Sequence, residues 1–208
     1  MSSTELFDIY NASNIHIGVD SRENVHAKGL WHHTFHCWIV DRSSGEDRLL
    51  LQLRHPDKDT YPGLLDISCA GHLLAGETVE EGVRELAEEL GIVAAFDELT
   101  YCGMVPQESI ISSDLIDREF NHVFLYESSR PVDEYSFQKE EITGLFTVGC
   151  DEFRELVLGQ TEECWVDGVV TDLQGEGLIR ERRRIGLHQV TPNSEEYYKL
   201  LFDNLKAE

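Results

Sequence analysis

The segment 71-GHLLAGETVEEGVRELAEELGI-92 constrains the fold of this chain more than any other stretch, because both ends of a helix can be read from it. Thr78 is followed three residues later by Glu81, which is the capping-box pattern of a helix start. Gly91 suits the position just after a helix end, where a left-handed backbone is common. The segment therefore predicts a helix over residues 79–90.

Three glutamates of this helix share one face. Glu85, Glu88 and Glu89 stand at positions i, i+3 and i+4, where side chains are neighbours. Like charges at this spacing destabilise a helix by about 0.2–0.5 kcal/mol per pair, so positive charge must lie close by. Clustered carboxylate oxygens suit Mg²⁺ or Mn²⁺. The glutamates taken alone are also compatible with a solvated acidic face, and the residues around them decide between the two.

The net charge of the chain also favours a bound cation. The 208 residues carry a formal net charge of -23, which repels nucleic-acid backbones and anionic membrane surfaces. We therefore expect neither nucleic acid nor a membrane as a partner. The same charge repels a small phosphorylated substrate unless a cation offsets it. An anionic substrate would thus require a metal.

The composition favours one globular domain in a reducing compartment. A chain of 208 residues can bury one sizeable core. It contains neither an apolar run of about 18 residues nor a signal-peptide pattern. Its five cysteines are scattered and form no CxxC pair, which argues against a disulfide framework or a zinc knuckle. We expect a cytoplasmic protein.

The remaining sequence predicts a mixed α/β domain around the acidic helix. Polar loops are expected at 55–65 and 107–118. An amphipathic helix is expected at 193–208, capped by Asn193 or Ser194. The other predicted elements are two short strands within 5–20, strands at 33–40, 48–54, 66–71, 99–105, 119–127 and 140–148, a helix at 150–159 and strand-like sequence over 165–190.

The order of residues in the acidic segment resembles the Nudix box. Residues 84–92, RELAEELGI, match its core of Arg-Glu, an aliphatic residue, any residue, Glu-Glu, any residue, Gly and an aliphatic residue. Gly71 and Glu77 match its opening glycine and first glutamate. Six residues separate Glu77 from Arg84, where the usual box has seven. The place of Glu77 in the site therefore stays open. Residues 71–92 are called the box segment below.

Gly82 lies inside the shortened part of the box segment. A glycine within a helix costs about 1 kcal/mol relative to alanine, so it needs a reason. Close packing of the helix against a sheet is the explanation we favour. A backbone adjustment that absorbs the shortened spacing is the alternative.

The resemblance implies a fold and an activity. Nudix enzymes share an α/β/α sandwich with a mixed sheet, in which the box forms a loop, a helix and a second loop. Residues 1–208 would be a single Nudix domain with an N-terminal strand extension and a C-terminal helix. The implied enzyme is a pyrophosphohydrolase that cleaves a nucleoside diphosphate linked to another group, with Mg²⁺ as cofactor and Mn²⁺ as the alternative.

The resemblance also implies roles for individual residues. The metal would be held by the carboxylates of Glu85, Glu88 and Glu89 and by a backbone carbonyl at Gly71. Arg84 would orient a glutamate through a bidentate ion pair, which suits its planar fork. A glutamate would take the proton from a metal-bound water. Glu89 and Glu119 are the candidates for that base, and the catalytic residues implied are Arg84, Glu88, Glu89 and Glu119.

A second set of residues resembles the Nudix branch that includes isopentenyl-diphosphate isomerase. The matching segments are 26-HAKGLWHHTFHCW-38, 70-AGH-72 and 117-DREFNHVF-124. The resemblance implies a second metal site made of His26, His32, His72, Asp117 and Glu119. Ordinary hydrogen-bonded histidines are the alternative explanation.

The isomerase's catalytic cysteine falls at Ala70 in this chain. Its neighbour Cys69 would point to the other face of a strand. We therefore prefer a hydrolase, with the isomerase as the second hypothesis. A non-catalytic binder of a nucleotide or effector is the third, and the intact glutamates argue against it.

Basic residues are few in this acidic chain, so the arginines are candidates for contact with the phosphates of a substrate. Arg54 ends a predicted strand and would meet a substrate phosphate or form a surface ion pair. Residues 180–184 hold four arginines, which would neutralise phosphates, face solvent or line a homodimer interface. The identity of the substrate is left open, because it depends on loops rather than on the box.

Overall fold

Strand β3 (Trp31–Asp41) is the strand around which the sheet is built. Its sequence, WHHTFHCWIVD, is rich in aromatic and β-branched residues that favour strands. It pairs antiparallel with β6 (Cys69–His72) and β4 (Arg48–Arg54), and parallel with β8 (Leu115–Glu127). The computed structural model describes residues 5–172 and 177–206. In that part of the chain, all eleven strands join one mixed sheet.

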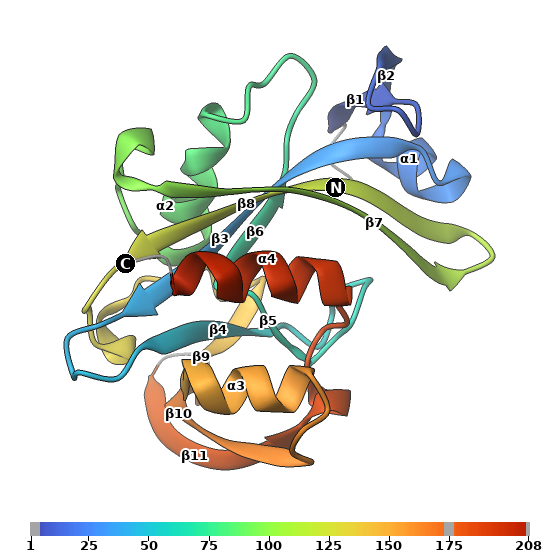
Figure 1. The fold of residues 1–208 in the computed structure, drawn as a ribbon. Helices are drawn as coiled ribbons and strands as arrows, with labels where there is room; N and C mark the ends of the chain where they lie inside the picture. The colour runs from blue at the N-terminus through green and yellow to red at the C-terminus, as the bar shows by residue number, and fades with distance from the viewer. Residues whose placement is uncertain (1–4, 173–176, 207–208) are drawn as a thin grey trace.

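The other elements follow in chain order around β3 (Figure 1). The remaining strands are β1 (Leu6–Tyr10), β2 (His16–Ser21), β5 (Leu65–Asp66), β7 (Thr100–Ser112), β9 (Ile142–Gly149), β10 (Glu163–Thr171) and β11 (Leu178–Gly186). The α-helices are α1 (Arg22–Lys28), α2 (Arg84–Leu90), α3 (Cys150–Val157) and α4 (Glu195–Leu205). The predicted mixed α/β fold is confirmed.

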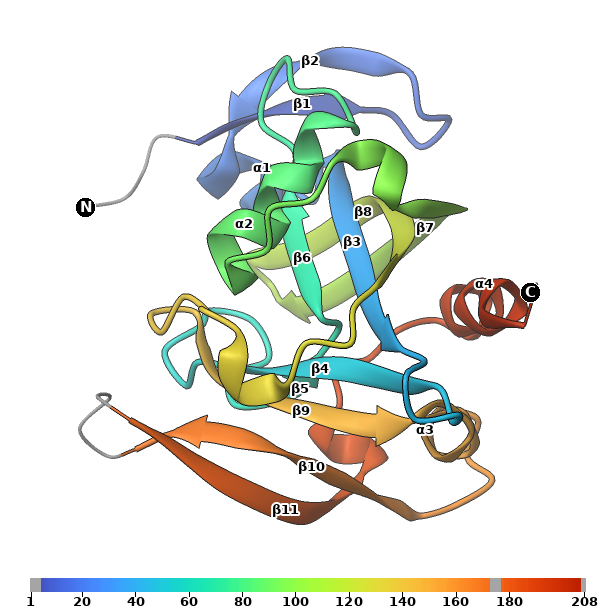
Figure 2. The ribbon, with the colours of Figure 1, turned by 90° about the vertical axis from the view of Figure 1, so that its left-hand side faces the viewer.

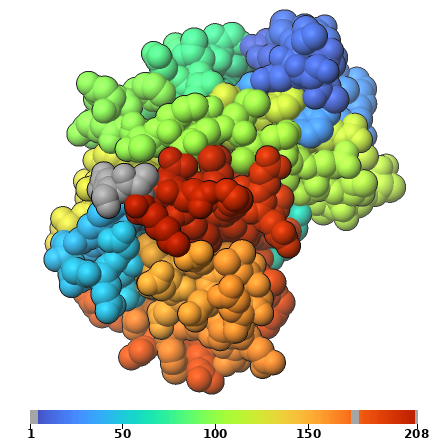
Figure 3. Space-filling view, viewed as in Figure 1, coloured from blue at the N-terminus to red at the C-terminus, as the bar shows by residue number. Residues whose placement is uncertain are grey.

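Alternate residues of β3 face two different hydrophobic clusters, as strand geometry requires. Trp38 and Val40 belong to the cluster that includes buried residues of α3 and α4. Phe35 and Ile39 belong to the cluster that includes Leu86 of α2. Helices thus cover both faces, with α3 and α4 on one side and α2 over β6 and β3 on the other (Figures 1 and 2). In the space-filling view α4 lies at the surface between β7 and α3 (Figure 3).

The prediction of a loop at residues 107–118 is wrong. Most of these residues extend β7 and β8 into a long antiparallel hairpin. Both faces of the hairpin tip are partly exposed, so its strands carry polar side chains and lack the apolar alternation that predicts a strand. Cross-strand pairs stabilise the tip in place of a hydrophobic core. Arg118 pairs with Glu108, and Ile110 lies opposite Ile116.

The helix predicted over 79–90 begins later than expected. Residues Glu81–Val83 form a 3₁₀ turn, and the α-helix starts at Arg84. The capping contacts at Thr78 are nevertheless present, because Thr78 and Glu81 bond each other reciprocally. Helix α1 was not expected, whereas α4 begins after its N-cap Ser194 as predicted.

Candidate functional site

The box segment places two carboxylates against strand β6. Glu85 and Glu89 are 8% and 7% exposed, although both are acidic. A Cβ atom on Gly71 would lie 2.0 Å from the Glu85 carboxyl carbon, so only glycine permits this approach. Glu89 Oε2 accepts the backbone N–H of Ala70 at 3.1 Å. The two carboxylates therefore meet β6 at neighbouring residues.

Burial of these carboxylates raises their pKa values. The pKa of Glu85 is raised to about 7, chiefly by burial, while the Arg84 charge opposes the rise. The pKa of Glu89 is raised to about 8, again chiefly by burial and then by the Glu85 charge. Two buried acids that repel each other are stabilised by a cation placed between them and solvent. Their chemistry therefore fits a divalent metal.

Arg84 connects the two halves of the box segment. Its Nε and Nη2 atoms donate to the two carboxylate oxygens of Glu77 at 2.6 and 3.0 Å. Nη2 also donates to the His72 carbonyl at 3.1 Å. Nη1 donates to Glu85 at 2.7 Å and to Glu88 at 3.1 Å. The shortened spacing therefore does not prevent a bidentate Arg84–Glu77 pair.

Glu88 lies apart from the other two glutamates. Its side chain is 57% exposed, and it forms an ion pair with Arg84 one helical turn away. Its role as a metal ligand stays a prediction, because the side chain would have to turn toward β6 to act with Glu85 and Glu89.

Gly82 is explained by packing. A Cβ atom there would lie 2.9 Å from both Leu73 Cδ2 and Phe35 Cβ. The turn before α2 thus approaches the sheet too closely for any side chain. This contact supports the packing explanation that the sequence favoured.

A second cluster of ligand-type side chains lies where α1, β3, β6 and β8 meet. One nitrogen each from His26, His32 and His72 and one oxygen of Asp117 all lie within 4.8 Å of one another. No other such group of three or more is found in residues 5–172 and 177–206. Glu119 lies at its edge, with Oε1 3.7 Å from His72 Nε2. This cluster is called the histidine site below.

Hydrogen bonds fix the rings of the histidine site. His26 Nδ1 lies 2.9 Å from the Arg22 carbonyl, and His32 Nδ1 lies 3.0 Å from the Leu30 carbonyl. A carbonyl only accepts, so both Nδ1 atoms carry a proton, and in a neutral ring with this proton Nε2 presents the lone pair. Such second contacts orient imidazole ligands in metal sites.

Several inward-facing atoms of the histidine site have no partner. His32 Nε2, His72 Nε2 and Asp117 Oδ1 are buried without a hydrogen bond. Burial lowers the pKa of His32 to about 3 and that of His72 well below its usual value, so both rings are neutral. Unpaired buried groups are costly, and a metal ion would satisfy all three. The residues present therefore fit a metal, which argues against ordinary hydrogen-bonded histidines.

Other predicted residues have internal partners. Arg54 donates to Asp66 Oδ2 at 2.7 Å and to the Thr60 carbonyl, so its phosphate contact stays a prediction. The arginines of β11 each lie beside an acid. The pairs are Arg180 with Asp133, Arg182 with Asp167, Arg183 with Glu181 and Arg184 with Glu163. They form a charge-balanced face rather than a free basic patch.

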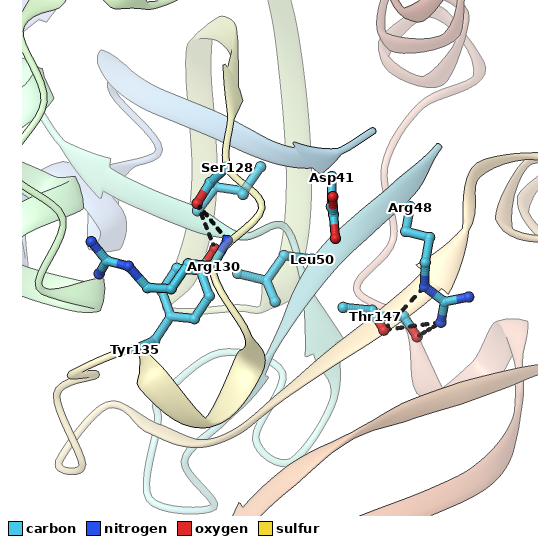
Figure 4. Close-up of a pocket in the computed structure, with 8 residues that line it drawn as sticks. Asp41, Arg48, Leu50, Ser128, Arg130, Tyr135 and Thr147 are labelled. Carbon is cyan, nitrogen blue, oxygen red and sulfur yellow. Dashed lines mark hydrogen bonds between the residues drawn. The ribbon is translucent and has the colours of Figure 1, made fainter. Parts of the chain in front are cut away.

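A shallow pocket near the end of β3 is separate from both clusters (Figure 4). Its lining includes Arg48, Ser128, Arg130 and Tyr135. Arg48 bonds Thr147, and Ser128 accepts from Tyr135. No residue of the box segment lines it, so it is not the candidate site.

Two polar residues near the histidine site escaped the sequence prediction. Asn121 is fully buried on β8, and His36 is 7% exposed on β3. Both share a strand face with the ligand-type residues, at spacings of two from Glu119 and four from His32. Strand alternation was the signal that could have found them. His33, by contrast, faces the other way and contacts His122 Nε2 at 2.6 Å.

Comparisons with known proteins agree with one family. The NUDIX domain matches residues 31–166. An uncharacterized Nudix hydrolase of Clostridium acetobutylicum is 37% identical over 197 residues, covering 95% of both chains. An isopentenyl-diphosphate Delta-isomerase of Serratia proteamaculans is 35% identical over 122 residues, covering 58% of this chain and 65% of the isomerase. The crystal structure of DR0079 from Deinococcus radiodurans aligns with a TM-score of 0.54 at 22% identity, covering 74% of this chain and 90% of DR0079.

The helices are short. None of those in the described ranges is long and apolar enough to cross a membrane.

Proposed function

The chain belongs to the Nudix family, and from this premise we propose that it is a divalent-cation-dependent pyrophosphohydrolase. Its substrate would be a small molecule in which a nucleoside diphosphate is linked to another group. The observation that carries the proposal is the pair of buried carboxylates, Glu85 and Glu89, against the backbone of Gly71 and Ala70. A pair of buried acids needs a cation, and an anionic substrate of so acidic a protein needs one too.

In this proposal each charged residue of the box segment has a separate role. Glu77 fixes the Arg84 guanidinium, which in turn holds Glu85 in place. Glu89 is oriented by the Ala70 N–H and is the group that accepts the proton of the attacking water. A divalent cation held by Glu85 and Glu89 would lower the pKa of water and draw charge from the phosphoryl oxygens.

The histidine site supplies a second set of ligands in the proposed enzyme. His26, His32, His72 and Asp117 would hold a transition metal or Mn²⁺, with Glu119 beside them. The Glu119 side chain is largely shielded from solvent, and this burial, followed by the Asp117 charge, raises its pKa well above the usual value. It remains the second candidate for the base. The free cysteines among the described residues accord with a reducing, cytoplasmic location.

Isomerisation of isopentenyl diphosphate is the second candidate function. The convergent histidine site favours it, and so does the similarity to the isomerase of Serratia proteamaculans. Ala70 argues against isomerisation, because an alanine methyl group cannot donate a proton to the substrate. Cys69 cannot substitute, since its buried thiol faces the α2 cluster and its pKa is raised well above the ordinary value, first by burial.

A turnover assay tests the main proposal. A panel of nucleoside diphosphate derivatives is incubated with Mg²⁺, with Mn²⁺ and with chelator, and phosphate-containing products are scored. We expect cation-dependent turnover that Glu89→Gln reduces by 10²-fold or more, about the contribution of a general base. The matched control is Glu98→Gln, which changes a glutamate that caps a turn away from β6. Equal turnover of wild type and Glu89→Gln would contradict the proposal.

A product analysis separates the two functions. Isopentenyl diphosphate and dimethylallyl diphosphate are each incubated with metal-loaded protein. We expect no interconversion by the wild type. Interconversion at a rate comparable to hydrolysis of any panel substrate would make the isomerase the correct assignment.

A further inference from the structure

One side chain of strand β1 packs against the histidine site. Hairpin β1–β2 lies beside α1, over the end of β6 that carries His72 (Figure 2). Phe7 of β1 is fully buried, whereas no residue of β2 is buried. The hairpin is therefore anchored at the histidine site through a single aromatic ring.

The Phe7 ring lies nearly parallel to two of the ligand-type rings. Its centroid is 4.8 Å from that of His72, with 11° between the planes, and 5.4 Å from that of His32, with 18° between the planes. It meets the His26 ring edge-on, at 6.2 Å and 88°. Aromatic pairs prefer such offset-stacked and edge-to-face arrangements. One phenylalanine thus contacts the rings of all three histidines in the site.

His72 depends on this contact more than the other two histidines do. His26 and His32 are each oriented by a backbone carbonyl beside Nδ1. Within residues 5–172 and 177–206, no hydrogen bond holds the His72 ring, and its buried Nε2 is unpaired. The torsion that sets the plane of a histidine ring has broad minima, so packing has to fix that plane. Among the aromatic rings around His72, Phe7 is the closest and the most nearly parallel.

Strand β1 is itself held by the box segment. The Ala75 N–H donates to the Leu6 carbonyl at 2.7 Å, and the Gly76 N–H donates to Asp8 Oδ2 at 2.7 Å. These two bonds hold the residues on both sides of Phe7. The loop that leads from β6 to α2 therefore also sets the place of the Phe7 ring against the histidine site.

We propose that Phe7 is a positioning residue of the histidine site, which holds the His72 imidazole in the orientation that binds a metal ion. The inference rests on the proposed function, which gives the histidine site a divalent metal. Phe7 has no ligand atom, so it acts through the ring beside it, as other contacts to metal ligands do. An aliphatic side chain would fill much of the same space without fixing the plane of the imidazole.

Binding of Co²⁺ tests this role, because the visible absorption of the ion reports the geometry of its ligands. The metal-free protein is titrated with Co²⁺ as wild type and as Phe7→Leu. Absorbance that His72→Gln removes is assigned to the histidine site. Phe7→Leu should raise the Kd of that site by about 10-fold or more, the loss typical of a removed contact to a metal ligand. Its absorption bands at saturation should also differ from those of the wild type.

Phe153→Leu is the matched control. Phe153 is as fully buried as Phe7, but it belongs to α3 and to the cluster that includes Trp38. This variant loses the same ring from a hydrophobic environment, so thermal unfolding should show a comparable loss of stability. Its Kd for Co²⁺ at the histidine site should stay within about 2-fold of wild type, with unchanged absorption bands.

A measurement on the wild type keeps the proposal falsifiable if Phe7→Leu fails to fold. Nuclear Overhauser effects between the ring protons of Phe7 and His72 should be present without metal and persist when Zn²⁺ saturates the site. Their loss on metal binding would overturn the positioning role. So would an unchanged Kd in folded Phe7→Leu, an equal loss of affinity in Phe153→Leu, or a wild type whose Co²⁺ absorbance does not depend on His72. Turnover enters none of these readouts, so absence of hydrolysis with the Phe7 effect intact would refute the hydrolase alone.

Discussion

Arg84 and Glu77 form a bidentate ion pair although the spacing between them in the sequence is one residue shorter than in the usual box. Six residues separate them instead of seven, which left the place of Glu77 open. The missing residue falls where the chain forms a 3₁₀ turn rather than an α-helix. The Leu74 N–H anchors Glu77 Oε2 at 2.8 Å, and the arginine fork then meets both carboxylate oxygens. A flexible arginine and a tighter turn together absorb the difference.

We predict that Arg84→Lys lowers activity although it keeps the charge. Lysine is a point charge and cannot reproduce the two parallel bonds to Glu77 together with the contact to Glu85. Two lost charged hydrogen bonds correspond to a fall in kcat/KM of about 10²-fold or more. Steady-state kinetics measure it. Arg118→Lys, which changes an arginine of the β7–β8 hairpin, should retain wild-type activity.

The raised pKa of Glu89 makes a prediction for the metal-free protein. Its folded-state pKa of about 8 exceeds the unfolded value near 4.3, so the folded state holds the proton more tightly. The resulting stability is complete below about pH 4.3 and is lost as pH rises through 8. In chelator, Glu89→Gln should therefore raise Tm at pH 8 by about 3 °C or more, with little change at pH 4.5.

Differential scanning calorimetry at the two pH values checks this expectation. Glu88→Gln is the control, because its exposed side chain loses little solvation on folding. A Glu89→Gln variant that is less stable than wild type at pH 8 would show that the ionised carboxylate is well accommodated without metal. That result would remove the electrostatic argument for a cation at this position.

Many individual residues of the candidate site could be predicted from the sequence. Glu85 and Glu89 follow from helical spacing, and His26, His32 and His72 follow from the isomerase-like segments. Their burial was not readable, because it depends on Gly71 and on the path of β6. Asn121 was missed because its meaning lies in the Thr34 contact across two strands separated by 87 positions.

Among the elements, the β7–β8 hairpin and helix α2 differ from the sequence prediction because tertiary contacts override the local sequence pattern. Residues 107–118 look polar because the hairpin tip has no core beneath it, yet cross-strand pairing keeps it extended. Helix α2 starts late because Gly82 is pressed against Phe35 and Leu73. The buried strands β3 and β4 were predicted well, since aromatic and aliphatic runs leave few alternatives.

Gly82→Ala should destabilise the protein through this contact. The added methyl would meet Phe35 Cβ and Leu73 Cδ2 at 2.9 Å, and β3 is held in place by pairing with β6 on one side and β8 on the other. Overpacking of this kind costs about 1–3 kcal/mol, which lowers Tm by several degrees in a chain of this size. Thermal unfolding in chelator measures it. Gly149→Ala is the control, since its nearest neighbour would be the exposed Glu152 side chain, with Oε2 at 3.1 Å. A Tm equal to wild type would refute the packing explanation.

Strand β6 joins the two groups of metal-binding residues across the thickness of the sheet. Gly71 and the Ala70 N–H contact Glu85 and Glu89 from the side of α2. His72 points to the opposite face and enters the histidine site. Arg84 also bonds the His72 carbonyl, so the first residue of α2 is attached to the backbone of a ligand-type residue. The four residues of β6 thus contact both groups, one from each face of the strand.

This arrangement predicts two separable classes of Mn²⁺ site in one protein. Replacing His32 and His72 by Gln should abolish one class, and Glu85→Gln with Glu89→Gln should abolish the other, because each pair supplies the buried ligands of one group. The surviving class should bind with an affinity within about 10-fold of wild type, a change of 1.4 kcal/mol through the shared strand. Mn²⁺ titrations followed by electron paramagnetic resonance count the sites. His16→Gln, at an exposed histidine on β2, should leave both classes intact. Loss of all Mn²⁺ binding in either double variant, with the fold retained, would mean that the two groups hold one metal cluster rather than two sites.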